Sequence, residues 1–261
     1  VALAGDGGEE LFGGRMLDGL ARSLAAARWF TRLPAPVRSA LTRSWPRSDR
    51  LRRWSVPAEA YVVQLGIGGA DVFTADERAS LLRDPALVRP ELRREVLAPF
   101  YEGLDTDPVN LALHGFLRSS LTEIGLTRAD RMASVSGLDV RFPLLDLAVV
   151  EAAAALPGSA KLRRTGGSLH TRWPLRGLLR GELPEVLVDR PKRGIPTLVG
   201  GWLSGPGRLF LEERCTRLKQ DPYGLWRPEA IDALRRDVDR SNAAANRLWS
   251  LFVLDSWLRD H

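Results

Sequence analysis

The residues best suited to chemistry lie at the start of the chain, in Val1–Gly14. Four apolar residues lead into Gly5-Asp6-Gly7-Gly8, two carboxylates follow at Glu9 and Glu10, and a second glycine pair ends the segment. An apolar run that ends in a glycine-rich turn predicts a buried strand opening into a ligand crevice. Glycines let the backbone approach a phosphate, and carboxylates bind divalent cations or transfer protons. A plain turn with solvated acids has the same pattern, so the rest of the chain must decide.

The composition is typical of a globular protein, and we expect a cytoplasmic one. The chain has 261 residues, of which 44% are hydrophobic and 27% charged. Its best candidate for a membrane span, Leu144–Leu156, is interrupted by Asp146 and Glu151, so we expect no membrane association. No charged-then-apolar leader pattern stands at the start. Cys215 is the only cysteine, which excludes disulfides within the chain and cysteine-based zinc sites.

The formal net charge of +6 raises the question of a nucleic-acid partner. Lysine occurs only at Lys161, Lys192 and Lys219, so arginine carries nearly all of the positive charge. The arginines are scattered, without the interleaved aromatic residues that single-strand binders use. The pattern therefore favours a partner with phosphates over a nucleic-acid groove.

Periodicity and capping patterns predict a mostly helical chain with one strand, at its N-terminus. Thr74 and Glu77 form a capping box, Asp107-Pro108 marks a helix start, and 161–169 is expected to be a loop. Parallel strands occur in sheets. The rest of the sheet is thus expected in sequence outside this chain, or in another chain. The predicted helices cover about 16–33, 57–66, 74–82, 90–101, 107–124, 128–135, 146–156, 171–181, 201–218 with an interruption near 205–206, 228–239 and 243–259.

Several common catalytic motifs are missing. No lysine follows a glycine, so the G-x-x-x-x-G-K-[ST] phosphate loop is absent, and there is no G-x-S-x-G nucleophile elbow. The three histidines, His114, His170 and His261, lie on separate segments, which disfavours a histidine metal cluster.

Four blocks, in order, resemble the glutamine-dependent asparagine synthetase family. Residues 2–14 are similar to its "LSGDGGDELFGG" motif, and 130–146 resemble "DRMSMAHGLEVRVPFLD". Residues 161–194 are similar to the run "K-L-R … T-K-W-L-L-R … L-P … R-P-K-x-G", and 247–258 resemble the closing tryptophan-bearing helix. The blocks cover a little under half of the chain and keep the family's order and spacing.

The resemblance implies an α/β ATP-pyrophosphatase (PP-loop, adenine-nucleotide hydrolase-like) domain, of which residues 1–261 would be the predominantly helical C-terminal portion. It also implies an AMP-forming amide ligase that uses ATP and Mg²⁺. A carboxylate such as aspartate attacks the α-phosphate, and ammonia or an amine then displaces AMP. Natural-product ligases of the β-lactam synthetase or lasso-peptide cyclase type remain an alternative.

The resemblance also implies roles for residues of the first block. Gly5, Gly7 and Gly8 would bring backbone N–H groups to pyrophosphate at a helix N-terminus. Asp6 occupies the position of an acidic residue near the reacting groups and is expected to act as acid, base or orienting group. Glu9 stands at the magnesium-binding aspartate position.

Two further residues carry implied roles. Lys192 would stabilise negative charge on the α-phosphate and on the leaving pyrophosphate. Asp139 stands at the glutamate of "LEVR" and would orient substrate or pair with a catalytic group. Arg141 is an equally good partner for Asp139, in which case that acid only forms a salt bridge.

Three departures from the family pattern bear on activity. Ala4 replaces a serine, Glu9 is one methylene longer than aspartate, and the pyrophosphate loop "S-G-G-x-D-S" does not occur. The amino-terminal cysteine of the glutaminase domain is also missing. We therefore expect the chain alone to make no AMP, and a partner chain that supplies the loop and glutaminase. The second hypothesis is a non-catalytic remnant that acts as an interaction module.

Overall fold

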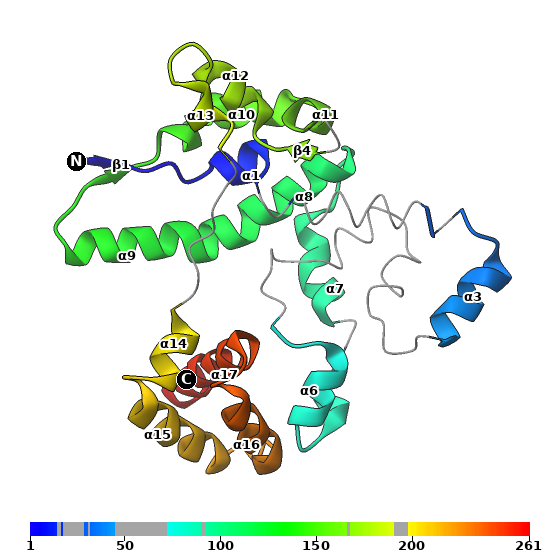
Figure 1. The fold of residues 1–261 in the computed structure, drawn as a ribbon, viewed down its shortest axis with the longest axis vertical. Coiled ribbons are helices and arrows are strands. Elements are labelled where there is room, and N and C mark those ends of the chain that lie inside the picture. The colour runs from blue at the N-terminus through cyan, green and yellow to red at the C-terminus, as the bar shows by residue number, and fades with distance from the viewer. Residues whose placement is uncertain are drawn as a thin grey trace. The chain divides into compact units, whose positions relative to one another are not determined.

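The described part of the chain is mostly helical, as predicted. The computed structural model describes residues 1–14, 17, 29–30, 32–44, 72–89, 92–165, 168–190 and 198–261. These residues belong to two compact units (Figure 1). Unit 1 comprises Val1–Gly69 and Leu92–Lys192, and unit 2 comprises Ala70–Glu91 and Arg193–His261. The predicted helix at 57–66 and most of the one at 16–33 lie outside the described residues.

Unit 1 contains short strands and helices of mixed length. No helix among the described residues of either unit has the length and apolar character needed to cross a membrane. The elements of unit 1 are β1 (Ala2–Leu3), α1 (Gly8–Phe12), α3 (Ala35–Ser44), α7 (Leu92–Leu97), η2 (Ala98–Phe100), α8 (Pro108–Phe116), η3 (Leu117–Leu126), α9 (Thr127–Val135), β2 (Val140–Arg141), η4 (Pro143–Leu145), α10 (Leu147–Ala155), α11 (Gly158–Lys161), β3 (Arg163–Thr165), β4 (Ser168–His170), α12 (Trp173–Leu179) and α13 (Glu185–Val188).

The predicted N-terminal strand exists and pairs in parallel with β2. Ala2 is in register with Val140 and Leu3 with Arg141. The Ala2 N–H donates to the Asp139 carbonyl at 2.8 Å, just before the paired residues of β2. Within the described residues this sheet has two strands, although parallel strands are normally buried on both faces of a larger sheet. The prediction of a single strand was wrong, because a two-residue strand such as β2 is too short to show any periodicity.

A continuous helical run follows Asp107, from α8 through the π-helical segment η3 to α9 (Figure 1). The Asp107 carboxylate accepts hydrogen bonds from the backbone N–H groups of Val109 and Asn110, at 2.9 and 3.1 Å, which confirms the predicted helix start. The predicted end at Gly125 was wrong. An interior glycine costs a helix only about 1 kcal/mol, and packing along the run outweighs that cost.

The segment expected to be a loop at 161–169 instead contains strands. β3 and β4 pair antiparallel, with Arg163 opposite His170 and Thr165 opposite Ser168. Three-residue strands rich in arginine have no apolar alternation, so the sequence pattern gave no strand signal.

Unit 2 is a helical bundle around one apolar cluster. Fully buried side chains come from α14, α15, α16 and α17, and include Leu203, Leu211, Ile231 and Leu248, each 0% exposed. The predicted interruption near 205–206 is confirmed, because it separates α14 from α15. The elements are α6 (Ala75–Leu81), η1 (Pro85–Leu87), α14 (Val199–Ser204), α15 (Arg208–Lys219), α16 (Pro228–Asp237) and α17 (Asn242–Asp260).

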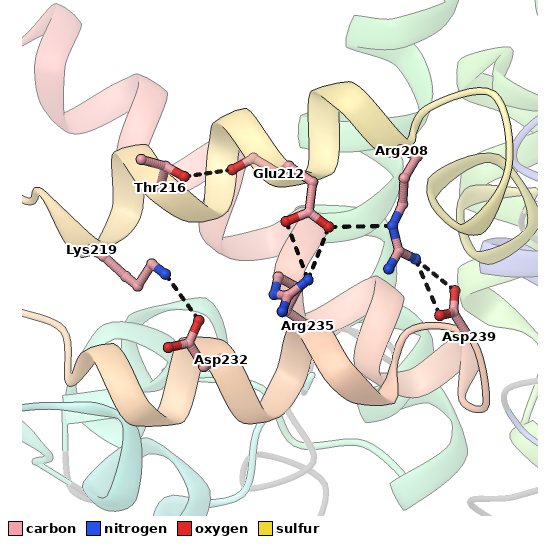
Figure 2. Close-up of polar contacts among 7 residues, drawn as sticks. All are labelled: Arg208, Glu212, Thr216, Lys219, Asp232, Arg235 and Asp239. Carbon is pink, nitrogen blue, oxygen red and sulfur yellow. Dashed lines mark hydrogen bonds and ion pairs between the residues drawn. The ribbon is translucent and has the colours of Figure 1, made fainter.

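Ion pairs connect α15 to α16 and to the residues just after α16, on the surface of this bundle (Figure 2). Glu212 of α15 accepts from Arg235 of α16 at 2.9 Å. Lys219 donates to Asp232 at 3.0 Å, about two turns later along α15 and about one turn earlier along α16. Arg208 completes the row by donating to Asp239, also at 2.9 Å.

Candidate functional site

The candidate site is centred on the glycine turn that joins β1 to α1. Gly7 has φ 92°, a left-handed conformation that glycine adopts without strain, and it caps the N-terminus of α1. The Leu11 N–H donates to the Gly7 carbonyl at 2.9 Å, which closes the first turn of the helix. Gly5 is exposed, and an added methyl group there would meet nothing within 4 Å. The backbone at Gly5 is thus open to a ligand.

The turn packs against the segment that follows β2, some 130 residues later in the chain. A methyl group on Gly7 would collide with the Leu145 side chain, and one on Gly8 would lie 3.0 Å from Leu144. These two glycines are therefore needed for close packing against η4. These contacts involve the Cα faces of Gly7 and Gly8, so the approach of their backbone N–H groups to a phosphate stays a prediction. Gly5 alone of the three has open surroundings.

A third sequence block reaches the same helix through Arg172. Its backbone N–H donates to the Phe12 carbonyl at 3.1 Å, at the end of α1. Its guanidinium lies 3.8 Å from the Glu9 carboxylate. Arg172 has φ 56°, the one positive value for a non-glycine residue among those described. Such a conformation costs about 1 kcal/mol or more, so the surrounding contacts must hold it.

Asp6 and Asp139 are not brought together by a direct contact. Asp6 follows the carboxyl end of β1, whereas Asp139 precedes the amino end of the parallel strand β2. No hydrogen bond or ion pair joins these two described residues. Asp139 instead accepts from both Nε and Nη2 of Arg141, at 3.1 and 2.8 Å, on an exposed surface. This ion pair raises the pKa of Arg141.

Comparison with known proteins gives a consistent family match. The family model for asparagine synthase matches residues 1–259. The chain belongs to the asparagine synthase family. It is 29% identical over 265 residues to a putative glutamine-hydrolysing asparagine synthetase of Mycobacterium tuberculosis, and equally so to one of Mycobacterium bovis. A glutamine-hydrolysing asparagine synthetase of Bacillus subtilis is 24% identical over 270 residues. No solved structure gives a significant match.

The matches cover most of this chain but less than half of each relative. They include 98% of this chain but 39% of the mycobacterial asparagine synthetases and 40% of the Bacillus subtilis one. The chain thus spans about two fifths of the length of the curated relatives it matches.

The resemblance of the four sequence blocks to asparagine synthetases is confirmed, and three of the blocks converge in space. Block one forms β1 and α1, block two supplies β2 and η4, and block three supplies Arg172. Block four lies in α17 of unit 2. Lys192, the cation predicted for the α-phosphate, lies outside the described residues, so its placement stays a prediction.

The described residues do not form a magnesium site by themselves. Glu9 presents its carboxylate toward Arg172, and its side chain packs against Gly14. No group of three or more histidine, cysteine, aspartate or glutamate side chains in the described ranges is placed to hold a metal ion. Magnesium is usually held by one or two carboxylates together with waters and substrate phosphates, so the metal-binding role of Glu9 stays a prediction.

Sequence reasoning passed over two residues that the structure places near α1. Arg172 lies in the third block, whose resemblance implies no role for it, and its conformation and its contact with Glu9 are visible only in the fold. Lys161 begins the segment that the sequence predicts to be a loop, yet the residue is only 2% exposed. A single basic residue beside Gly158 and Ala160 gave no signal of burial. Only the tertiary neighbours of that lysine reveal it.

Proposed function

We propose that this chain forms part of an ATP-dependent, AMP-forming amide ligase of the asparagine synthetase type. The family match over residues 1–259 supports the class of reaction. The convergence of three sequence blocks around α1 is the observation that carries the assignment to unit 1. One substrate is a small carboxylate and the other is ammonia or an amine. The relatives are named for asparagine, the amide of aspartate, so aspartate is the first candidate for the carboxylate. A natural-product ligase differs only in these substrates.

In this proposal the glycine turn forms one wall of the adenylating site. The open backbone at Gly5 approaches the nucleotide phosphates, and Asp6 orients or deprotonates the attacking group. Asp6 is suited to this because it makes no hydrogen bond or ion pair with another described residue. Arg172 neutralises phosphate charge beside Glu9, as guanidinium groups do in bidentate contacts. Lys192 supplies a second cation, and Asp139 positions substrate through Arg141.

The opposite wall requires further strands. Leu3 belongs to the parallel strand β1 and Val1 directly precedes it, yet they are 75% and 89% exposed. Parallel sheets are covered on both faces. We therefore propose that additional strands complete the sheet and carry the pyrophosphate loop, together with the glutaminase that would supply ammonia. These parts belong to a longer chain or to a partner. We expect no AMP formation by the 261 residues alone.

A chimaera tests the proposal. This chain would replace the matching segment of the Mycobacterium tuberculosis relative, and pyrophosphate release would be measured with ATP, magnesium, aspartate and ammonium. We expect release by the chimaera and none by the isolated chain. Asp6→Asn should lower the rate by about 10²-fold or more, whereas the exposed Glu151→Gln on α10 should leave it unchanged.

Each result has a clear meaning. Pyrophosphate release by the isolated chain would refute the incomplete site. A folded chimaera without activity would favour the second function, a non-catalytic interaction module that uses the exposed apolar edge of β1. An Asp6→Asn chimaera as active as the parent would remove Asp6 from the chemistry.

A further inference from the structure

A cavity of unit 1 lies between α1, α8 and α10, and its lining includes none of the glycines of the turn. Its volume is about 240 Å³, a little below the roughly 300–1,000 Å³ of most small-molecule sites. Most of its lining is apolar, and a few polar side chains from α1, α8 and α11 complete it. Such a mixture is typical of sites for small ligands. The apolar lining comprises Leu11, Leu104, Leu113, Leu117, Val150 and Ala154.

Lys161 is the most unusual group in this cavity. Its side chain lines the cavity, yet the residue is only 2% exposed. Its ammonium donates one hydrogen bond, to Oδ1 of Asn110 at 2.7 Å. Burial lowers the pKa of Lys161, and the nearby charge of Asp107 opposes that shift. Because an ammonium has three N–H donors, two of them have no acceptor among the described residues.

The neighbours of Lys161 cannot turn to supply those acceptors. The Asn110 amide nitrogen donates to Oδ2 of Asp107 and to the Leu156 carbonyl, both at 3.0 Å, which fixes the amide orientation. Asp107 also accepts from the backbone of Val109, Asn110 and Gly158. Both carboxylate oxygens of Asp107 are therefore engaged. A buried cation with unsatisfied donors is costly, and a ligand oxygen would remove that cost.

Glu10 supplies the opposite charge to the same cavity. Its side chain lines the cavity from α1, and it makes no hydrogen bond or ion pair with Lys161 or with any other described residue. Lys161 and Glu10 thus carry opposite charges on the lining of one largely apolar cavity, with no ion pair between them. A ligand with one charge would satisfy only one of them. A zwitterion would pair with both.

We propose that this cavity binds a free amino acid with an apolar side chain. Its α-carboxylate accepts from the ammonium of Lys161, and its α-ammonium donates to the carboxylate of Glu10. The side chain of the ligand contacts the leucine and valine lining. This site is independent of the proposed ligase chemistry, because neither Lys161 nor Glu10 has a role there.

Calorimetric titration of the whole chain tests the class of ligand. L-Leucine is the probe, compared with 4-methylpentanoate, which lacks the amino group, and 3-methylbutylamine, which lacks the carboxylate. Both analogues should bind at least about tenfold more weakly, since each lacks one of the two ionic contacts that the zwitterion makes. L-Aspartate should not compete, because its second carboxylate would enter the apolar lining. The proposal fails if L-leucine does not bind, or if either analogue binds as tightly.

Two variants test the named residues. Lys161→Met keeps the apolar stem and should abolish L-leucine binding, and Glu10→Gln should weaken it about tenfold. Glu151→Gln, on α10 but outside the cavity lining, is the control and should bind as the parent does. Glu10 is half-buried, and glutamine has nearly the same shape. Glu10→Gln therefore tests the proposed ligand contacts even if Lys161→Met does not fold. Unchanged affinity in a folded Lys161→Met or in Glu10→Gln would overturn the proposal.

Discussion

Unit 2 packs its described helices around one apolar cluster, whereas the described part of unit 1 has two smaller ones. One cluster of unit 1 surrounds Leu111 and Leu113, and the other surrounds Leu11 and Phe12. Unit 1 also exposes apolar side chains at its sheet, such as Leu3. Apolar burial supplies roughly 25 cal/mol per Å², so unit 2 has the more self-sufficient source of stability.

The two units also differ in how some of their charged side chains are paired. In unit 2 Glu212 of α15 and Asp232 of α16 are paired with basic residues, as Figure 2 shows. In unit 1 Asp6 and Glu10 have no ionic partner among the described residues, and Lys161 has a single hydrogen bond. Exposed pairs contribute at most about 1 kcal/mol each. These pairs of unit 2 tie α15 to α16, whereas the carboxylates of Asp6 and Glu10 in unit 1 remain available to a ligand.

The largest expected effect comes from the core of unit 2. Leu248→Ala removes a side chain that is 0% exposed and should lower the free energy of unfolding by about 2–5 kcal/mol. Cys215, in the same cluster, reports the opening of unit 2, because burial raises the pKa of its thiol to about 11. Alkylation by iodoacetamide near about pH 8 requires opening and should be at least about thirtyfold faster in the variant.

Leu209→Ala is the matched control on α15. That leucine is 85% exposed, and its loss should change the alkylation rate by less than about twofold. Equal alkylation rates in Leu248→Ala and Leu209→Ala would contradict the contrast between the units, because they would mean that the apolar cluster does not keep unit 2 closed.

An intermediate effect is expected in unit 1, at the glycine turn. Gly7→Ala forces alanine into a left-handed conformation and against Leu145, so it should destabilise the turn by about 2 kcal/mol. Hydrogen exchange measured by mass spectrometry should show faster exchange in peptides covering 1–14 and 140–146. Because the apolar clusters of the two units are separate, alkylation of Cys215 should stay at the parent rate.

Gly5→Ala provides the control for this variant. An added methyl group at Gly5 meets no other atom, so the free energy of opening measured by hydrogen exchange should change by no more than about 0.5 kcal/mol. A Gly7→Ala variant that accelerates the alkylation of Cys215 would show that the units open together, and the contrast drawn between them would then be lost.

The sequence was sufficient for features that depend on neighbouring residues. The Asp107 cap, the break between α14 and α15 and the order of the four family blocks all follow from local patterns. Features set by distant contacts were not accessible. The burial of Lys161 depends on Asn110, 51 positions earlier, and the packing of Gly7 depends on Leu145. Strands of two or three residues, such as β2 and β3, contain too few positions for alternation to be visible.

The smallest expected effect tests whether α6 belongs to the cooperative core of unit 2. Its capping box is as predicted: the Thr74 N–H donates to the Glu77 carboxylate at 2.8 Å, and the Glu77 N–H donates to Thr74 Oγ1 at 3.2 Å. Thr74→Ala should cost about 1 kcal/mol. Cys215 lies on α15, not on α6. If α6 opens together with the rest of unit 2, alkylation of Cys215 should still be about fivefold faster in Thr74→Ala.

Ser80→Ala on the same helix separates the cap from general helix effects. The Ser80 hydroxyl donates to the Glu77 carbonyl on an exposed surface, and alanine is a better helix former, so alkylation should stay at the parent rate. If Thr74→Ala also alkylates at the parent rate while exchange in 74–82 is faster, α6 opens alone. Unit 2 would then have its own weakly held element, and its self-sufficiency would be confined to α14–α17.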